Sequence, residues 1–153
     1  MKERIFFGLL LLVTVSSFSQ INYEKGYFIE SSGDTLECYI KNRGWLNNPT
    51  EFEYKLAENT DSKIKTIKTV KEFGVGDLMY KKFLVKIDTS KERIEDLDED
   101  RNPKFIEKTL FLKVLVEGDA NLYHYTGNSF SDRFFYDFMG SEIEQLVHNT
   151  IYN

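Results

Sequence analysis

The chain has 153 residues, of which 41% are hydrophobic and 29% charged, and its formal net charge is −5. This length and composition suit one globular domain, and the acidic balance argues against nucleic acid as a partner. One cysteine and two histidines exclude a disulfide scaffold and argue against a Cys/His zinc site.

The N-terminus has the features of a secretory signal peptide. The basic residues Lys2 and Arg4 precede an apolar run over 5–15. Small residues then occupy the positions that signal peptidase recognises before its cleavage site. The apolar run would span roughly 17 Å as a helix, short of the ~30 Å hydrocarbon core of a membrane. We therefore expect 1–19 to be a cleaved signal peptide and 20–153 to form a single β-rich domain without a transmembrane span. The mature protein would be exported to the periplasm, associated with the outer membrane, or extracellular.

The first predicted structure is a β-hairpin. The strand-like segments Gly26–Ser31 and Thr35–Lys41 flank the turn residues 32–34. In the second segment, Cys38 falls on the apolar side of an alternating pattern. Since an apolar surrounding raises the pKa of a thiol, we expect Cys38 to be a core residue rather than a nucleophile.

Short strands continue along the chain. They are predicted at Glu51–Leu56, Ile64–Lys68, Val70–Val75, Tyr80–Ile87, Thr109–Glu117, Asn121–Thr126 and Arg133–Phe138. The segments before and after Thr69 are two strands or one bent strand. Thr109–Glu117 is apolar on both faces, which favours a central place in the sheet.

Two segments have helical patterns. Ser90–Leu97 has a serine cap and apolar residues three apart, which predicts one or two helical turns. After Gly140, Ser141 and Glu144 have the spacing of a capping box, and apolar residues then follow at helical spacing up to Ile151.

The predicted fold is therefore mainly β. We expect an antiparallel, curled sheet or a small sandwich of about eight short strands, with a C-terminal amphipathic helix. An outer-membrane barrel is the rival fold, but its strands need about 9 to 11 residues of alternation. Only the segment at Thr109 approaches that length.

Several segments resemble a family of uncharacterised exported proteins of Bacteroidota, mostly flavobacteria. They are Ile21–Ile29, Asn48–Leu56, Phe111–Gly118, the pair Leu122-Tyr123, and the leader ending Ser17–Gln20. The resemblance covers nearly all of the chain after the leader and implies an exported protein. Longer members of the family continue into a part that resembles an outer-membrane barrel. The resemblance implies no catalytic residue.

One acidic segment has the spacing of a calcium loop. Asp96, Asp98, Asp100 and Glu107 correspond to positions 1, 3, 5 and 12 of an EF-hand. Arg101 stands where the sharp bend of that loop requires glycine. We therefore favour a solvated acidic loop, with a weak calcium-binding module as an alternative, and we expect no cofactor.

The histidines and aromatic residues are candidates for binding roles. Neither His124 nor His148 has a partner at metal-ligand spacing. Seven aromatic residues crowd one stretch: Tyr123, Tyr125, Phe130, Phe134, Phe135, Tyr136 and Phe138. We expect most of them to fill the core, although such rings also form binding faces. Because Phe135 alternates with Arg133 and Asp137, it is the ring on the polar side and the candidate partner-binding residue.

The sequence contains neither a Gly-x-Ser-x-Gly elbow nor a Walker or dinucleotide-binding motif. We therefore expect a non-catalytic exported envelope module that binds a protein or glycan. The alternative is an envelope hydrolase with an unrecognised active site. A cleft in which carboxylates converge would favour the hydrolase, whereas a face with exposed aromatic rings would favour the binding module.

Overall fold

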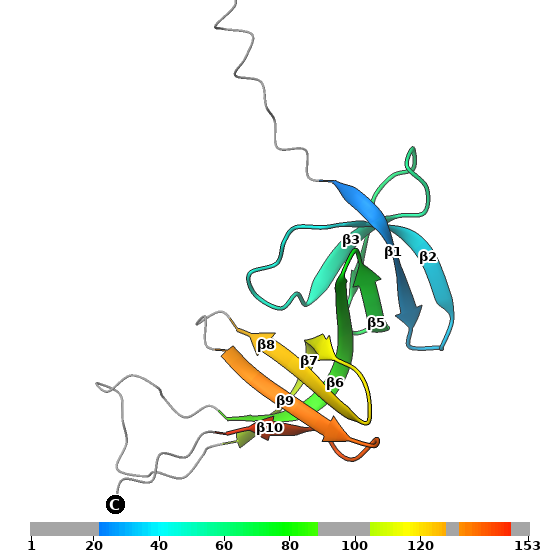
Figure 1. Ribbon diagram of the computed structural model, residues 1–153. Helices are drawn as coiled ribbons and strands as arrows, with labels where there is room; N and C mark the ends of the chain where they lie inside the picture. The colour runs from blue at the N-terminus through cyan, green and yellow to red at the C-terminus, as the bar shows by residue number, and fades with distance from the viewer. Residues whose placement is uncertain (1–21, 89–104, 128–131, 148–153) are drawn as a thin grey trace, which may run out of the picture.

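The computed structural model describes residues 22–88, 105–127 and 132–147. Its ten strands form one antiparallel sheet in the order β10-β9-β8-β7-β6-β5-β1-β2-β3-β4 (Figure 1). The mainly β, antiparallel and curled architecture is therefore confirmed, although there are ten strands rather than about eight. Within the described residues, no helix has the length and apolar character needed to cross a membrane.

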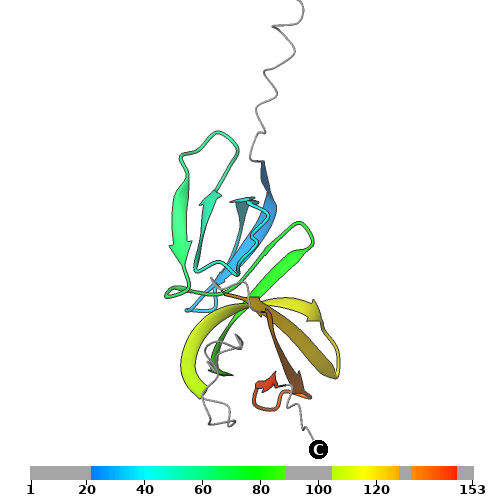
Figure 2. The ribbon, with the colours of Figure 1, turned by 90° about the vertical axis from the view of Figure 1, so that its left-hand side faces the viewer.

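The strands divide into two halves. The first half contains β1 (Tyr23–Glu30), β2 (Thr35–Lys41), β3 (Glu51–Lys55), β4 (Lys63–Thr66) and β5 (Val70–Val75). The second half contains β6 (Leu78–Asp88), β7 (Phe105–Val116), β8 (Ala120–Thr126), β9 (Asp132–Phe138) and β10 (Glu144–Leu146). In Figure 2, strands β1 to β4, coloured blue to green, lie above strands β7 to β10, coloured yellow to red.

The predicted hairpin is formed by β1 and β2. Gly33 has a φ of 106°, a left-handed conformation that glycine adopts without steric cost. The Glu30 amide donates to the Asp34 carbonyl at 2.8 Å, and the Gly33 amide donates to the Glu30 carbonyl at 3.0 Å. The turn residues of the sequence thus set the register of this strand pair.

The first half curls because β5 pairs with β1 rather than with β4. Only Ile67–Thr69 connects β4 to β5, so two separate strands form here and the two ends of this five-strand stretch approach each other. The Ile67 amide donates to the Thr50 carbonyl at 2.9 Å, and the Ser31 amide donates to the Thr69 carbonyl at 2.8 Å. These bonds tie the connection to both neighbouring strand pairs and hold the curl.

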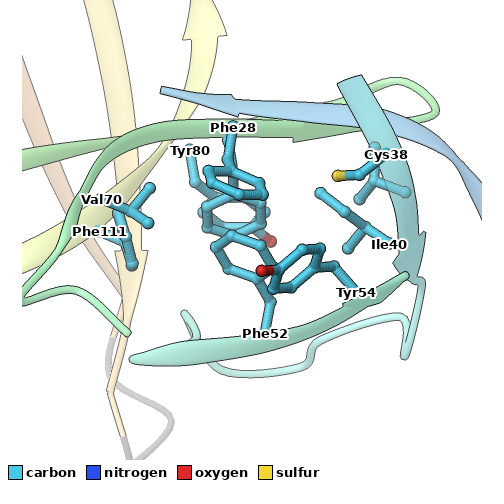
Figure 3. Packing of buried hydrophobic residues seen from close by; sticks show 10 residues of the cluster. Phe28, Cys38, Ile40, Phe52, Tyr54, Val70, Tyr80 and Phe111 are labelled. Carbon is cyan, nitrogen blue, oxygen red and sulfur yellow. The ribbon is translucent and has the colours of Figure 1, made fainter. Parts of the chain in front are cut away.

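The sheet encloses two cores. The aromatic core contains Phe28, Cys38, Ile40, Phe52, Tyr54, Val70, Phe73, Val75, Tyr80 and Phe111, most of which are labelled in Figure 3. The second core contains Val85, Ile87, Leu110, Leu112, Tyr123 and Phe135.

The two cores lie on opposite faces of β7. Phe111 belongs to the aromatic core, whereas its neighbours Leu110 and Leu112 belong to the second core. Successive residues of a strand point to opposite faces, so β7 is buried on both sides at this point. The expectation of an apolar, central strand is therefore confirmed.

Asn48 connects the first half to the second. Its Nδ2 donates to the carbonyls of Phe111 and His124, both at 2.9 Å, and its Oδ1 accepts from the Thr126 amide at 2.9 Å. The pairing of β7 with β8 ends at Lys113 and His124. The Asn48 amide therefore replaces the next ladder bonds between these two strands.

The predicted C-terminal helix is wrong in the described residues, because Glu144–Leu146 forms β10 and pairs with β9. Met139 and Gly140 have φ values of 51° and 77°, which reverse the chain in a tight turn. Gln145 then accepts a hydrogen bond from the Asp88 amide at 2.8 Å. If Glu144–Leu146 were helical, the backbone of β9 would lose the hydrogen bonds that it makes with β10. Unpaired backbone groups are costly. The remainder of the predicted helix, and the predicted turns at Ser90–Leu97, lie outside the described residues.

Candidate binding surface

Three aromatic side chains of β9 lie on the solvent-facing side of the second half. Phe134, Tyr136 and Phe138 are 40%, 37% and 55% exposed. They occupy alternate positions of one strand and therefore share one face. If a fully exposed ring is taken as about 200 Å², these three leave on the order of 250 Å² of surface open to solvent.

The pairing register extends this surface across four strands. Tyr136 lies opposite Leu122 of β8, and Leu122 lies opposite Val116 of β7. Phe134 lies opposite Leu146 of β10. Directly opposite residues of antiparallel strands share a face, so these side chains are neighbours. The outer aromatic face is defined here as Val116, Leu122, Phe134, Tyr136, Phe138 and Leu146.

Several carboxylates lie along the outer aromatic face, which also carries Lys113 at its β7 margin, opposite His124. Asp132 precedes Phe134 at one end of the row, and Glu144 accepts a hydrogen bond from the Tyr136 hydroxyl at 3.0 Å. Asp119 and Glu142 are exposed in the turns beside Phe138. The Met139 amide donates to the Asp119 carbonyl at 2.7 Å, which brings these two turns together. The rim is therefore acidic at both ends of the aromatic row.

The expectation that Phe135 lies on the polar side is wrong. Phe135 is fully buried in the second core, and the three rings on the other side of β9 are exposed. The strand alternates as expected, but the face that meets the second core is the one with fewer rings. The pairing of Phe135 with Tyr123 places it among apolar side chains of β6 and β7.

Asp137 is buried on the same side as Phe135, with 6% of its surface exposed. Its Oδ1 accepts from Asn121 Nδ2 and its Oδ2 accepts from the Tyr123 hydroxyl, both at 2.8 Å. Burial and this carboxylate raise the pKa of the Tyr123 phenol well above its usual range. A carboxylate whose oxygens all accept hydrogen bonds can be buried in a core. The presence of Asp137 on one side of β9 therefore does not show that this side faces solvent.

His124 lies beside the outer aromatic face, with its ring 5.0 Å from that of Phe134. Its Nε2 is 2.8 Å from Asp132 Oδ1 and 3.4 Å from Thr126 Oγ1. In a catalytic triad the acid holds one ring nitrogen while the other activates the nucleophile. Here one nitrogen faces both groups, and the Thr126 hydroxyl itself donates to Asp132. The arrangement is therefore a hydrogen-bonded cluster and not a triad.

Glu53 carries the best-connected carboxylate of the first half. It accepts hydrogen bonds from Tyr23, Lys41 and Arg43. The hydrogen bonds from Tyr23 and Lys41 lower its pKa to about 2. A group that stays ionised to such low pH is a poor general acid or base at neutral pH, so this cluster serves structure rather than proton transfer.

The remaining candidates do not form a site. Cys38 is 5% exposed, and burial raises the pKa of its thiol to about 11, so its place in the core is confirmed. Asp96, Asp98 and Asp100 lie outside the described residues, as do His148 and Phe130. Glu107 is exposed on β7 opposite Lys86. Across the described residues, no group of three or more His, Cys, Asp or Glu side chains could hold a metal ion.

The sequence pattern reveals only part of the outer aromatic face. It favours the core for the three rings of β9 and a helix for Leu146. The detectable signal was the alternation of the rings along β9. Val116 and Leu122 join the face only through strand register, which the sequence of either strand alone does not reveal.

Comparison with protein-family models, with curated proteins and with solved structures finds no match for this chain.

Proposed function

We propose that this protein is a non-catalytic, exported module of the cell envelope that binds a protein or glycan partner on its outer aromatic face. The observation that carries the proposal is the row Phe134, Tyr136 and Phe138, which remains exposed although Phe135 between them is fully buried. The largest apolar patch on a typical folded monomer is about 300–600 Å² and is often functional, and the three rings together with their aliphatic neighbours form a patch of this kind.

The composition of the face supports binding rather than loose packing. Aromatic rings provide large contact area at little cost in side-chain entropy, and they are enriched in interface cores. The rings also stand on a paired strand, since β9 is bonded to β8 on one side and to β10 on the other. Such a rigid scaffold reduces the entropy that binding must overcome.

Export is part of the proposal and is supported by the basic start, apolar run and small residues of 1–19. The intact mass of the protein recovered from the producing cell should correspond to a chain beginning at Gln20. A full-length chain recovered from the cytosol would contradict export.

Site-specific photocrosslinking tests the binding role. A benzoylphenylalanine placed at Phe134 or Phe138 should crosslink an envelope component in the producing cell. The matched control is Ile64 on β4, which is 62% exposed and lies in the other half. Equal crosslinking from Ile64, or none from the two ring positions, would contradict the proposed function.

A further inference from the structure

We infer that the partner of the outer aromatic face is a protein surface formed by an amphipathic helix, with an apolar stripe flanked by lysine or arginine. This inference rests on the proposed function and adds the chemical class of the partner. Three features of the face lead to it.

The first feature is the backbone of the strands that carry the face. β9 is paired on both sides, with β8 and with β10. A ligand on this face therefore contacts side chains, because the backbone amides and carbonyls of β9 are already paired with β8 and β10. An extended peptide would leave its own amides and carbonyls unpaired there, whereas a helix satisfies them internally. Strand addition requires an open sheet edge, which on this side is the three-residue strand β10 and not the face itself, so a helix fits the face better.

The second feature is the chemistry of the rings. Phe134 and Phe138 offer no hydrogen-bonding atom, and the Tyr136 hydroxyl already donates to Glu144. Sugars present hydroxyl groups along their whole length, and a site that binds them must satisfy those groups with polar partners, whereas Asp119, Glu142 and Asp132 stand only at the ends of this row. The aliphatic neighbours Val116 and Leu146, both about half exposed, match the apolar stripe of a helix instead.

The third feature is the charge of the rim. Asp119 and Glu142 lie beside Phe138, and Asp132 lies at the other end of the row. Asp132 is held in its ionised form, because hydrogen bonds from Thr126 and His124 lower the pKa of its carboxyl group. A partner with basic flanks is attracted to this rim, whereas an acidic partner is repelled. A second copy of this chain would bring the same carboxylates against one another.

The length of the row is compatible with a helix. Residues 134 to 138 span roughly 14 Å at about 3.4 Å per residue of strand. A helix covers the same distance in about nine residues, at 1.5 Å per residue. Two to three turns of helix, with apolar residues at i, i+3, i+4 and i+7, would therefore cover the row.

The experiment uses two designed helical peptides with the same leucine stripe, one flanked by lysines and one by glutamates. Fluorescence anisotropy should show that the protein from Gln20 onward binds the lysine peptide about tenfold more tightly or better, with affinity falling as salt rises. Phe138→Ser should weaken binding of the lysine peptide about tenfold. Ile64→Ser, the matched control on the other half, should leave the affinity unchanged.

Two charge-reversed double variants distinguish the effect of the carboxylates beside the face from the effect of the net charge of the protein. Asp119→Lys with Glu142→Lys should invert the preference between the peptides. Glu58→Lys with Asp61→Lys makes the same change in net charge at exposed positions of the loop before β4 and should not invert it. Equal affinity for the two peptides, or inversion by both variants, would overturn the inference.

Two further outcomes separate this inference from the proposed function. If the protein binds chitooligosaccharides and Phe138→Ser abolishes that binding, the inference of a helical partner is overturned and a glycan partner is favoured. If neither peptide binds while ring-dependent crosslinks in the envelope persist, the inference fails and the proposed function stands. Loss of those crosslinks would instead remove the proposed function.

Discussion

The two halves of the sheet use their aromatic residues in opposite ways. In the aromatic core, to which β6 contributes Tyr80 and β7 contributes Phe111, six of the ten buried residues are rings, and Trp45 packs against them. In the second core only Tyr123 and Phe135 are buried rings, and the outer aromatic face of the second half leaves three rings exposed. The aromatic core therefore gains stability from its rings, whereas the outer aromatic face keeps rings available for contact.

The exposed apolar residues follow the same division. Ten of the large hydrophobic side chains exposed in the described residues lie between 105 and 147, compared with Leu46, Leu56 and Ile64 in the first half. Scattered exposed residues need no explanation, but a contiguous group does.

The largest expected effect is the loss of a central ring. Phe73 contacts Phe52, Tyr80, Phe111 and Trp45, with ring centroids between 4.4 and 5.8 Å. We expect Phe73→Ala to lower the free energy of unfolding by about 4 kcal/mol, because the cavity is lined by rigid rings. Phe135→Ala in the smaller second core should cost about 3 kcal/mol. Urea denaturation measures both, and a larger loss for Phe135→Ala would reverse the comparison.

The second prediction concerns the connection between the halves. Asn48→Ala removes the amide that bonds β7 and β8 and leaves three backbone groups without that partner. We expect a loss of about 2 to 3 kcal/mol in the free energy of unfolding. Asn47→Ala is the matched control, since the buried Asn47 Oδ1 has no hydrogen-bond partner. A loss for Asn47→Ala as large as that for Asn48→Ala would show that the amide bonds are not the cause.

The third prediction uses pH to examine the first half. Because the folded pKa of Glu53 lies near 2, below its ordinary value of 4.5, its ionised form stabilises the fold above about pH 4.5. This contribution is lost as pH falls from 4.5 through 2. Solvent screens the ion pairs of Glu53, so Glu53→Gln should cost about 1 kcal/mol at neutral pH. Denaturation curves of wild type and variant should converge at low pH, and a constant difference down to pH 2 would contradict the assignment.

The smallest expected effect lies on the outer aromatic face. Phe138→Ser should change the free energy of unfolding by less than about 0.5 kcal/mol, because its ring is half exposed and leaves no cavity. The variant should also be more soluble, since it shortens the exposed apolar row. A loss comparable to that of Phe135→Ala would mean that the ring belongs to the core and would remove the basis of the proposed function.

Much of the fold could be read from local patterns. The hairpin around Gly33 and the strand Val70–Val75 follow from local patterns, as does the C-terminal part of β7, which begins four residues before the predicted Thr109, because alternation and turn residues act over a few positions. Cys38 was placed correctly for the same reason. The signal peptide and the envelope location remain predictions from the sequence.

What local patterns could not decide was which side of a strand meets the core. The alternation along β9 is the same whichever face is buried, so Phe135 was placed outside and its neighbours inside. The choice depends on whether β6 and β7 offer apolar partners to one face, and those strands are distant in sequence. For the same reason, Glu144–Leu146 became a strand although its spacing suits a helix. The free edge of β9 offered backbone partners that no local helical preference could match.

The sequence by itself therefore determined the secondary structure class, the turns and the presence of a large aromatic set, because these depend on neighbouring residues. Only the tertiary structure decided which rings are buried, where Asn48 inserts, and that Val116, Leu122 and Leu146 join one surface. Each of these depends on the register between strands, and register is set by the burial of whole faces against partners far along the chain.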